Sequence, residues 1–168
     1  MLQEILDAIK AIKFNKMVTC PLTYPLTLNG SDAATALESG DTLGFVTELR
    51  VPTSGIIYGA TLYDFDDKGI ATDLEIFTAP IANVAVDAAF APTDAEMLNF
   101  LTELNFVAFD DQGGSQTSEI FNVGKGYSTP TGVLYLQGVT RGTPTVTAGS
   151  PYRVRLYIIS DDPNWKEY

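Results

Sequence analysis

The stretch "GIIYGATLYDFDDKGIATDLEIF", residues Gly55 to Phe77, places two runs of β-branched and aromatic residues on either side of an acidic segment. Apolar and polar positions alternate along such runs with a period of two, which is typical of β-strands with one buried face. In the first run the residues expected to share a face are Ile56, Tyr58, Ala60 and Leu62. Between the runs, a type I turn from Asp66 would place Gly69 in the left-handed conformation. The stretch therefore predicts a β-hairpin.

The same alternation continues along most of the chain, with Gly, Pro, Asp and Ser between the runs. The expected strands are residues 17–20, 22–28, 42–51, 55–65, 72–78, 103–109, 117–123, 132–140 and 152–160. In the last strand, Val154, Leu156 and Ile158 are expected to point away from Arg153, Arg155 and Tyr157. Because a sheet with one apolar face must pack on a second layer, these strands predict an all-β fold, an antiparallel β-sandwich that is jelly-roll-like.

A helical pattern is found near the start of the chain. The apolar residues that recur there at spacings of three and four are Leu2, Ile5, Ile9 and Ile12. That spacing places them on one side of a short N-terminal α-helix over residues 2–14. We therefore predict an amphipathic helical arm of residues 1–14, followed by a β-sandwich domain of residues 15–168. The apolar stripe of this arm either packs on the chain's own core or contacts another protein subunit, and the sequence leaves both open.

The alternation breaks between residues 78 and 103. Thr93, followed three residues later by Glu96, is typical of a capping box at the start of a helix. We expect this helix to run to about Leu101. We also expect the whole segment to run over the surface of the sandwich or to contact a neighbouring molecule.

Acidic residues cluster after several of the predicted strands. Four residues match the first, third, sixth and twelfth positions of an EF-hand calcium loop, namely Asp64, Asp66, Gly69 and Glu75. The fifth position, however, is Lys68, where the loop needs an oxygen ligand, and the flanking runs predict strands rather than helices. The segments "FDDQGG" (109–114) and "SDDPN" (160–164) repeat the pattern. We interpret all three as turns at strand ends, and we expect no metal and no cofactor.

Residue content limits the chemistry that the chain can perform. It has no histidine and one cysteine, Cys20. Histidine bases, histidine-containing triads and thiolate metal clusters are therefore excluded within one chain. The sequence favours a protein that is not an enzyme, although a carboxylate pair for glycoside hydrolysis stays open. The net charge of -11 repels phosphate backbones and anionic headgroups, so we expect neither nucleic acid nor a membrane as a partner.

Three segments of the chain resemble a family of small virion proteins of tailed bacteriophages. They are "GIIYGATLYDFDDKGIATDLEIFTAPI", "APTDAEMLNFL" and "GVLYLQGVTRGTPTVTAGSPYRVRLYIISDD", and the resemblance covers residues 22–162. It implies a capsid cement or decoration protein on the capsid surface of the virion. It also implies binding across subunits of the major capsid protein, as a homo-oligomer with a trimer favoured. The arm lies outside the resemblance, and its stripe supplies the candidate protein contacts Leu2, Ile5, Ile9 and Ile12.

Two other functions stay open at this point. One is a carbohydrate-binding module on the virion for attachment to the host. Its candidate sugar-stacking residues are Tyr58, Tyr63, Tyr127 and Tyr152. The other is a neck or head–tail joining protein, which would share the location on the virion and differ in the number of copies per particle.

Overall fold

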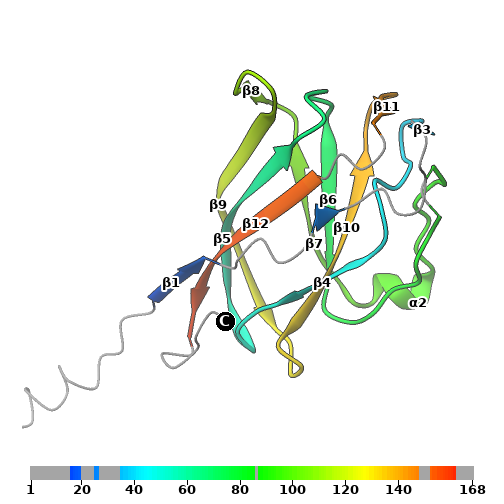
Figure 1. Cartoon of the computed structure of the whole chain (residues 1–168). Helices are drawn as coiled ribbons and strands as arrows, with labels where there is room; N and C mark the ends of the chain where they lie inside the picture. Colours follow the sequence, from blue (N-terminus) through cyan, green and yellow to red (C-terminus); the bar gives the residue numbers. More distant parts are fainter. Residues whose placement is uncertain (1–15, 20–24, 27–34, 86, 148–151, 162–168) are drawn as a thin grey trace, which may run out of the picture.

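The computed structural model describes residues 16–19, 25–26, 35–85, 87–147 and 152–161 (Figure 1). Its strands are β1 (Lys16–Thr19), β2 (Pro25–Leu26), β3 (Thr35–Ala36), β4 (Thr47–Arg50), β5 (Ser54–Asp64), β6 (Thr72–Phe77), β7 (Phe100–Phe106), β8 (Asp110–Asp111), β9 (Gln116–Ser128), β10 (Val133–Thr140), β11 (Thr145–Val146) and β12 (Tyr152–Ser160). A short helix, α2 (Asp94–Met97), lies between β6 and β7. The predicted all-β fold is confirmed.

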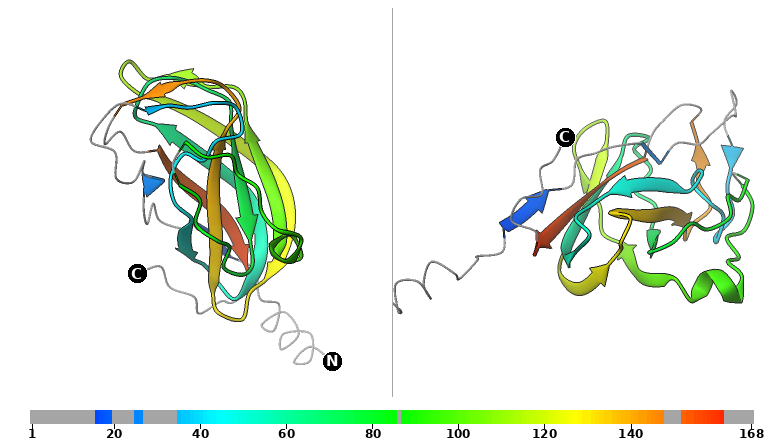
Figure 2. Two further views of the ribbon diagram at one scale, coloured as in Figure 1. Left: turned by 90° about the vertical axis from the view of Figure 1, so that its right-hand side faces the viewer. Right: turned by 90° about the horizontal axis from the view of Figure 1, so that it is seen from below.

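Most of the strands form two antiparallel sheets that pack face to face, and β3 and β11 form a separate two-stranded sheet. Sheet A has the order β1-β12-β5-β9-β8, with β2 also paired to β12, and sheet B has the order β4-β10-β6-β7. Figure 1 shows β9, β5 and β12 side by side in one layer and β6, β7 and β10 in the other. The turned views of Figure 2 show the same two layers from the side and from below.

The order in which strands pair follows a nested pattern. The innermost pair is β6 with β7, and it is enclosed in the sequence by β5 with β9, then β4 with β10, then β1 with β12. Successive pairs alternate between sheet B and sheet A. A long antiparallel hairpin wound round a core in this way is a jelly roll. The predicted jelly-roll-like sandwich is therefore confirmed.

Apolar side chains from both sheets fill the space between them. The core includes Ala60, Leu62, Leu74, Ile76, Leu104, Phe106, Leu134, Leu136, Val154, Leu156 and Ile158. Removing this apolar surface from water is the main stabilising contribution to the fold. The predicted division of β12 is confirmed, since its buried residues alternate with half-exposed ones along the whole strand.

The prediction for the first half of β5 is wrong. Ile56 is 39% exposed, whereas its neighbour Ile57 is fully buried. The register with β12 shifts between Tyr157, which pairs with Gly59, and Ile158, which pairs with Ile57, so Tyr58 is an extra residue that reverses the alternation. A Cβ atom on Gly59 would lie 2.5 Å from the carbonyl oxygen of Ile120, so the approach of β5 and β9 here requires glycine.

The acidic segment after β5 forms a corner between the sheets. The carboxylate of Asp64 is fully buried and accepts hydrogen bonds from the backbone N–H groups of Asp66, Lys68 and Gly69 at 2.8, 2.9 and 2.8 Å. Gly69 has a φ of 58°, the predicted left-handed conformation. The predicted hairpin is wrong, however, because β5 belongs to sheet A and β6 to sheet B. The carboxylate satisfies N–H groups that leave the sheet, so the chain can change layers here.

The second acidic segment is the turn that the sequence predicts. Strands β8 and β9 form a hairpin there, in which the Gln112 N–H donates to the carbonyl oxygen of Ser115 at 2.8 Å. The Gly113 N–H donates to Asp111 Oδ1 at 2.6 Å. Most of the third predicted turn, residues 160–164, lies outside the described residues.

Helix α2 begins where the sequence predicts. Thr93 is its N-cap, and both hydrogen bonds of the capping box with Glu96 are present. The helix ends at Met97 rather than near Leu101. The reason is that Phe100 already pairs with sheet B as the first residue of β7, which also moves that strand ahead of its predicted start.

Some predictions concern residues outside the described ranges. They are the helix over residues 2–14 with its stripe Leu2, Ile5, Ile9 and Ile12, the boundary between residues 14 and 15, and Cys20. Within the described ranges, no helix combines the length and the apolar character needed to cross a membrane.

Replacing Asp64 should destabilise the fold strongly. Asp64→Ala leaves three backbone N–H groups without their acceptor, one in a buried and two in partly buried hydrogen bonds, and a buried unsatisfied group costs about 1–3 kcal/mol. We expect a loss of about 2 kcal/mol or more in the free energy of unfolding, measured by urea denaturation. The matched control Asp111→Ala frees one exposed N–H and should lose less than about 1 kcal/mol. Equal losses in the two variants would contradict the role given to Asp64.

Candidate functional site

The outer face of sheet B carries a cluster of charged side chains. Because side chains alternate along β6, its leucine and isoleucine point into the core, whereas Asp73 and Glu75 lie on the outer face. Pairing of β6 with β7 sets Glu103 directly beside Glu75. Arg141 follows the end of β10 and reaches the same place. We call Asp73, Glu75, Glu103 and Arg141 the carboxylate cluster.

The connection between β6 and β7 folds back over this face and is held at several points. The Phe90 N–H donates to the carbonyl oxygen of Gly40 at 2.9 Å. The Glu96 carboxylate accepts the N–H groups of Ala82 at 2.6 Å and of Thr93 at 2.7 Å. The hydrogen bond from Ala82, followed by those from Thr93, lowers the pKa of Glu96. The loop is therefore tied both to itself and to the segment before β4.

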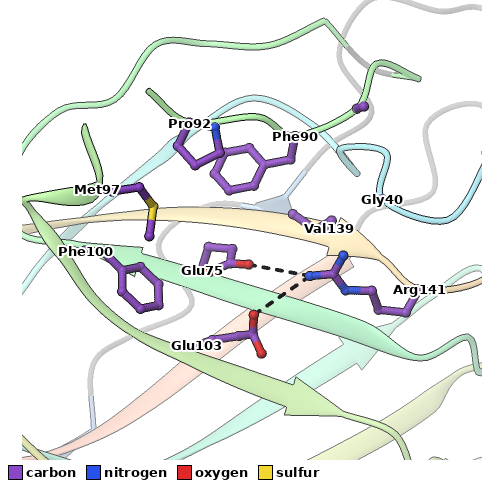
Figure 3. A pocket seen from close by; sticks show the side chains of 10 residues that line it. Gly40, Glu75, Phe90, Pro92, Met97, Phe100, Glu103, Val139 and Arg141 are labelled. Carbon is purple, nitrogen blue, oxygen red and sulfur yellow. Dashed lines mark ion pairs between the residues drawn. The ribbon is translucent and has the colours of Figure 1, made fainter. Parts of the chain in front are cut away.

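A cavity of about 330 Å³ lies between this loop and the sheet. Figure 3 shows Phe90, Pro92 and Met97 on the side of the loop and of α2, and the charged side chains on the side of the sheet together with Phe100 of β7 and Val139 of β10. The lining residues are Gly40, Glu75, Ala89, Phe90, Pro92, Met97, Phe100, Glu103, Val139 and Arg141. The cavity is thus apolar on the side of the loop and mixed, charged and apolar, on the side of the sheet.

Arg141 is the cation of the cluster. Its Nη2 lies 3.6 Å from Glu75 Oε1 and 3.8 Å from Glu103 Oε2, and its Nε donates to Asp73 Oδ2. That hydrogen bond is the main cause that raises the pKa of Arg141. Asn105 Nδ2 donates to Asp73 Oδ1 at 2.8 Å and also to Glu103 Oε1. One guanidinium therefore faces three carboxylates, and an amide helps to orient two of them.

Glu75 is the carboxyl group whose ionisation is most disfavoured. Burial raises its pKa, and the hydrogen bond with Glu103 and the charges of Glu103 and Asp73 raise it further, whereas Arg141 opposes them. The result is a pKa of about 7. Near neutral pH, Glu75 therefore carries a proton in a large fraction of molecules, and this proton sits between two neighbouring glutamates.

The cluster has the ligand types of a cation site, but it already holds a cationic group. Carboxylate oxygens of Asp73, Glu75 and Glu103 lie within 4.8 Å of one another. Arg141 contacts all three, so a metal ion would have to displace the guanidinium. The arrangement is suited to holding a proton beside an ion-pair network.

The EF-hand alternative does not match this geometry. Asp64 uses its carboxylate to accept backbone N–H groups, and Asp66 Oδ2 accepts the Thr147 N–H at 2.8 Å. Glu75 lies in the carboxylate cluster on the outer face of sheet B. The three carboxylates at the matched positions, Asp64, Asp66 and Glu75, are therefore not brought together around one site.

A second notable surface is the outer face of sheet A, opposite the core. Its side chains, which we call the aromatic face, are Ile56, Tyr58, Thr61 and Tyr63 of β5, Thr117, Glu119 and Phe121 of β9, and Arg153, Arg155, Tyr157 and Ile159 of β12. The ring of Phe121 is 45% exposed and lies 6.0 Å from the ring of Tyr58 and 5.5 Å from that of Tyr157, between centroids. Aromatic contacts therefore join the three strands across this face.

Two arginines lie on the aromatic face without an ionic partner in the described part of the chain. The guanidinium of Arg153 lies 5.5 Å from the centroid of the Phe65 ring, and that of Arg155 lies 6.0 Å from the centroid of the Tyr63 ring. Among the described residues, neither arginine forms an ion pair. The Nε atom of each is buried and has no hydrogen-bond acceptor there. Both cations are held in place and remain available to an anion.

The sequence predicted part of the aromatic face, because it placed Arg153, Arg155 and Tyr157 on one side of the last strand, but little of the carboxylate cluster. The candidate contacts Leu2, Ile5, Ile9 and Ile12 lie outside the described residues. Alternation could have paired Asp73 with Glu75, but Glu103 and Arg141 join them only through strand register.

Comparison of the chain with protein-family models, curated proteins and solved structures found no match.

Replacing Glu75 should change how stability depends on pH. The folded state keeps the proton up to a pKa of about 7, whereas the unfolded chain releases it near the ordinary value of 4.5. Wild-type stability should therefore fall as pH rises through this window, and Glu75→Gln should remove that fall. Arg141 and Glu103 are partly exposed, so solvent screens part of this effect. We therefore expect the free energy of unfolding of Glu75→Gln to rise relative to that of wild type by about 1–2 kcal/mol from pH 4 to pH 8.

Urea denaturation of both proteins at several pH values measures this difference. The matched control is Glu48→Gln, on an exposed position of β4, which should keep the wild-type pH profile. A constant difference between Glu75→Gln and wild type from pH 4 to pH 8 would contradict the raised pKa.

Proposed function

We propose that this protein is a structural virion protein of a tailed bacteriophage, a capsid cement protein that stabilises the head by binding across subunits of the major capsid protein. The aromatic face is the observation that carries this proposal. Tyrosine, phenylalanine and arginine are enriched at the centres of protein interfaces, whereas lysine, glutamate and aspartate are depleted there. Here these residue types form one continuous surface over three strands, which supports a function in protein association.

The fold and the sequence support the same function. Jelly rolls are used by viral capsid domains and by lectins. The resemblance to small virion proteins covers residues 22–162, which includes sheet B and all of sheet A except β1. The net charge of -11 would keep the free protein soluble before it assembles. A cement protein needs no chemistry, because it acts by burying surface across subunit boundaries.

The arm is the proposed contact with the capsid. Its stripe, Leu2, Ile5, Ile9 and Ile12, would lie on an apolar site of a capsid subunit, in the way that amphipathic helices bind grooves. An isolated helix of this length is marginal in water, so binding would stabilise it.

A carbohydrate-binding function is the second candidate, and two tyrosines favour it. Tyr58 and Tyr63 are half-exposed on the aromatic face, where sugar rings could stack. The suggestion is wrong for Tyr127 and Tyr152, which are 7% and 1% exposed. A glycan array with and without calcium separates the two functions. Saturable binding that Tyr63→Ala abolishes would support the carbohydrate function and contradict the cement function.

A neck or head–tail joining protein is separated from cement by copy number. Quantitative gel analysis of purified particles counts the chains per virion. Copies distributed over the whole head support a cement protein, whereas the number expected for one ring supports a joining protein.

Removing the stripe should abolish attachment to heads. The variant has serine at Leu2, Ile5, Ile9 and Ile12. We expect it to bind heads of the major capsid protein at least about a hundredfold more weakly, since each buried side chain contributes about 1 kcal/mol or more to binding. The control variant Gln3→Ser with Lys10→Ser changes the polar side of the same helix and should bind normally. Co-sedimentation with heads is the measurement, and unchanged occupancy of the stripe variant would contradict the assignment. Circular dichroism verifies that the sandwich stays folded.

A further inference from the structure

The aromatic face has a regular arrangement of side chains in rows across the sheet. Strand register places Arg155, Thr61 and Glu119 in one row, running from β12 through β5 to β9. The next row runs from Tyr157 through Gly59 to Phe121. In both rows β5 is the central strand, and the residues on the two outer strands are different. They are a cation and an anion in the first row, and a tyrosine and a phenylalanine in the second.

We propose that this face binds the same face of a second copy of the chain, about a two-fold axis that runs along β5. Such an axis exchanges β12 and β9 and keeps each row opposite itself. Arg155 of one copy then faces Glu119 of the second copy, and Glu119 faces the second copy's Arg155. In the next row Tyr157 faces Phe121 in the same reciprocal way. The pattern is self-complementary in charge and in aromatic contacts.

The same two charges do not pair in the described part of one chain. They lie two strands apart, about 9–10 Å across a sheet, and both side chains project from the same face, so neither points at the other. No ion pair between Arg155 and Glu119 is present among the described residues. Two sheets that pack face to face lie about 10 Å apart, a distance that an arginine and a glutamate on opposite sheets can bridge. A second copy therefore supplies what each chain lacks.

The side chains are already oriented for this contact. The Thr61 hydroxyl lies 3.2 Å from Glu119 Oε1 and 3.0 Å from the Tyr157 hydroxyl, which fixes the glutamate beside the tyrosine. Glu119 is exposed, and its Oε2 accepts no hydrogen bond in the described part of the chain. The cation–π contact with Tyr63 restrains Arg155. Little side-chain freedom would be lost on association.

Charge also argues for this face rather than another part of the surface. Two copies of a chain with a net charge of -11 repel each other in most orientations. The aromatic face departs from that average, because its two arginines balance Glu119 and the neighbouring Asp110 of β8, which pairs with Thr117. Copies can therefore approach through it with the least repulsion.

This inference rests on the proposed function and deepens it. A two-fold dimer carries two arms, so both can bind neighbouring capsid subunits at once, and the second attachment is intramolecular. The dimer differs from the trimer that the resemblance implies. A three-fold ring would need two different surfaces on each chain, whereas the aromatic face matches itself.

Charge reversal tests the dimer without any capsid. We expect the wild-type protein to be a dimer in sedimentation equilibrium. Arg155→Glu places two glutamates face to face, and Glu119→Arg places two arginines face to face, so each variant should dimerise at least about tenfold more weakly. An equimolar mixture of the two variants should form a heterodimer, because both facing pairs are then of opposite charge. The double variant with both changes in one chain should recover the homodimer.

The matched controls are Glu48→Arg and Arg50→Glu, two exposed positions of β4 in sheet B, which should leave dimerisation unchanged. A wild-type protein that is monomeric up to about 1 mM, a trimer, or a mixture that forms no heterodimer would each overturn the inference. Binding to heads is measured separately. If the protein forms the dimer but does not bind heads, the proposed function is contradicted and the inferred dimer still holds.

Discussion

Each time the chain crosses between the two sheets, its backbone N–H groups must find acceptors outside the strand ladder, and at the corner after β5 one buried side chain, Asp64, supplies them. This corner decides that β5 and β6 do not pair although they follow each other in sequence. The innermost pair of strands then forms in sheet B and the next pair in sheet A. The whole winding of the jelly roll depends on that alternation, and so does the position of both outer faces.

The two outer faces that result are different in character. On sheet B the connection between β6 and β7 covers the surface, and beneath it Arg141 balances part of the charge of three carboxylates. Its ionisable groups are coupled to the stability of the fold, with Glu75 as the group most sensitive to pH near neutrality. On sheet A the aromatic face has a row of rings and two arginines without carboxylate partners in the described residues. We therefore propose that association occurs through sheet A.

Alternation along the sequence predicted the long strands well. The expected ranges for β5, β6, β10 and β12 agree with the observed ones within about one residue, because each has a long run with one buried face. Two-residue strands such as β8 show no period and could not be predicted. The bulge at Tyr58 depends on pairing with β12 and the corner at Asp64 on a change of sheet, and local patterns encode neither. For the same reason the carboxylate cluster could be predicted only as far as Asp73 and Glu75.

The central claim is that the aromatic face is the surface through which this protein associates. Hydroxyl-radical footprinting of the intact chain over a range of concentrations tests it most directly. We expect oxidation of Phe121, Tyr157 and Tyr63 to fall as concentration rises, while Leu98 and Val107, which are 87% and 73% exposed, react equally throughout. Oxidation of the aromatic face that does not change with concentration would contradict the claim.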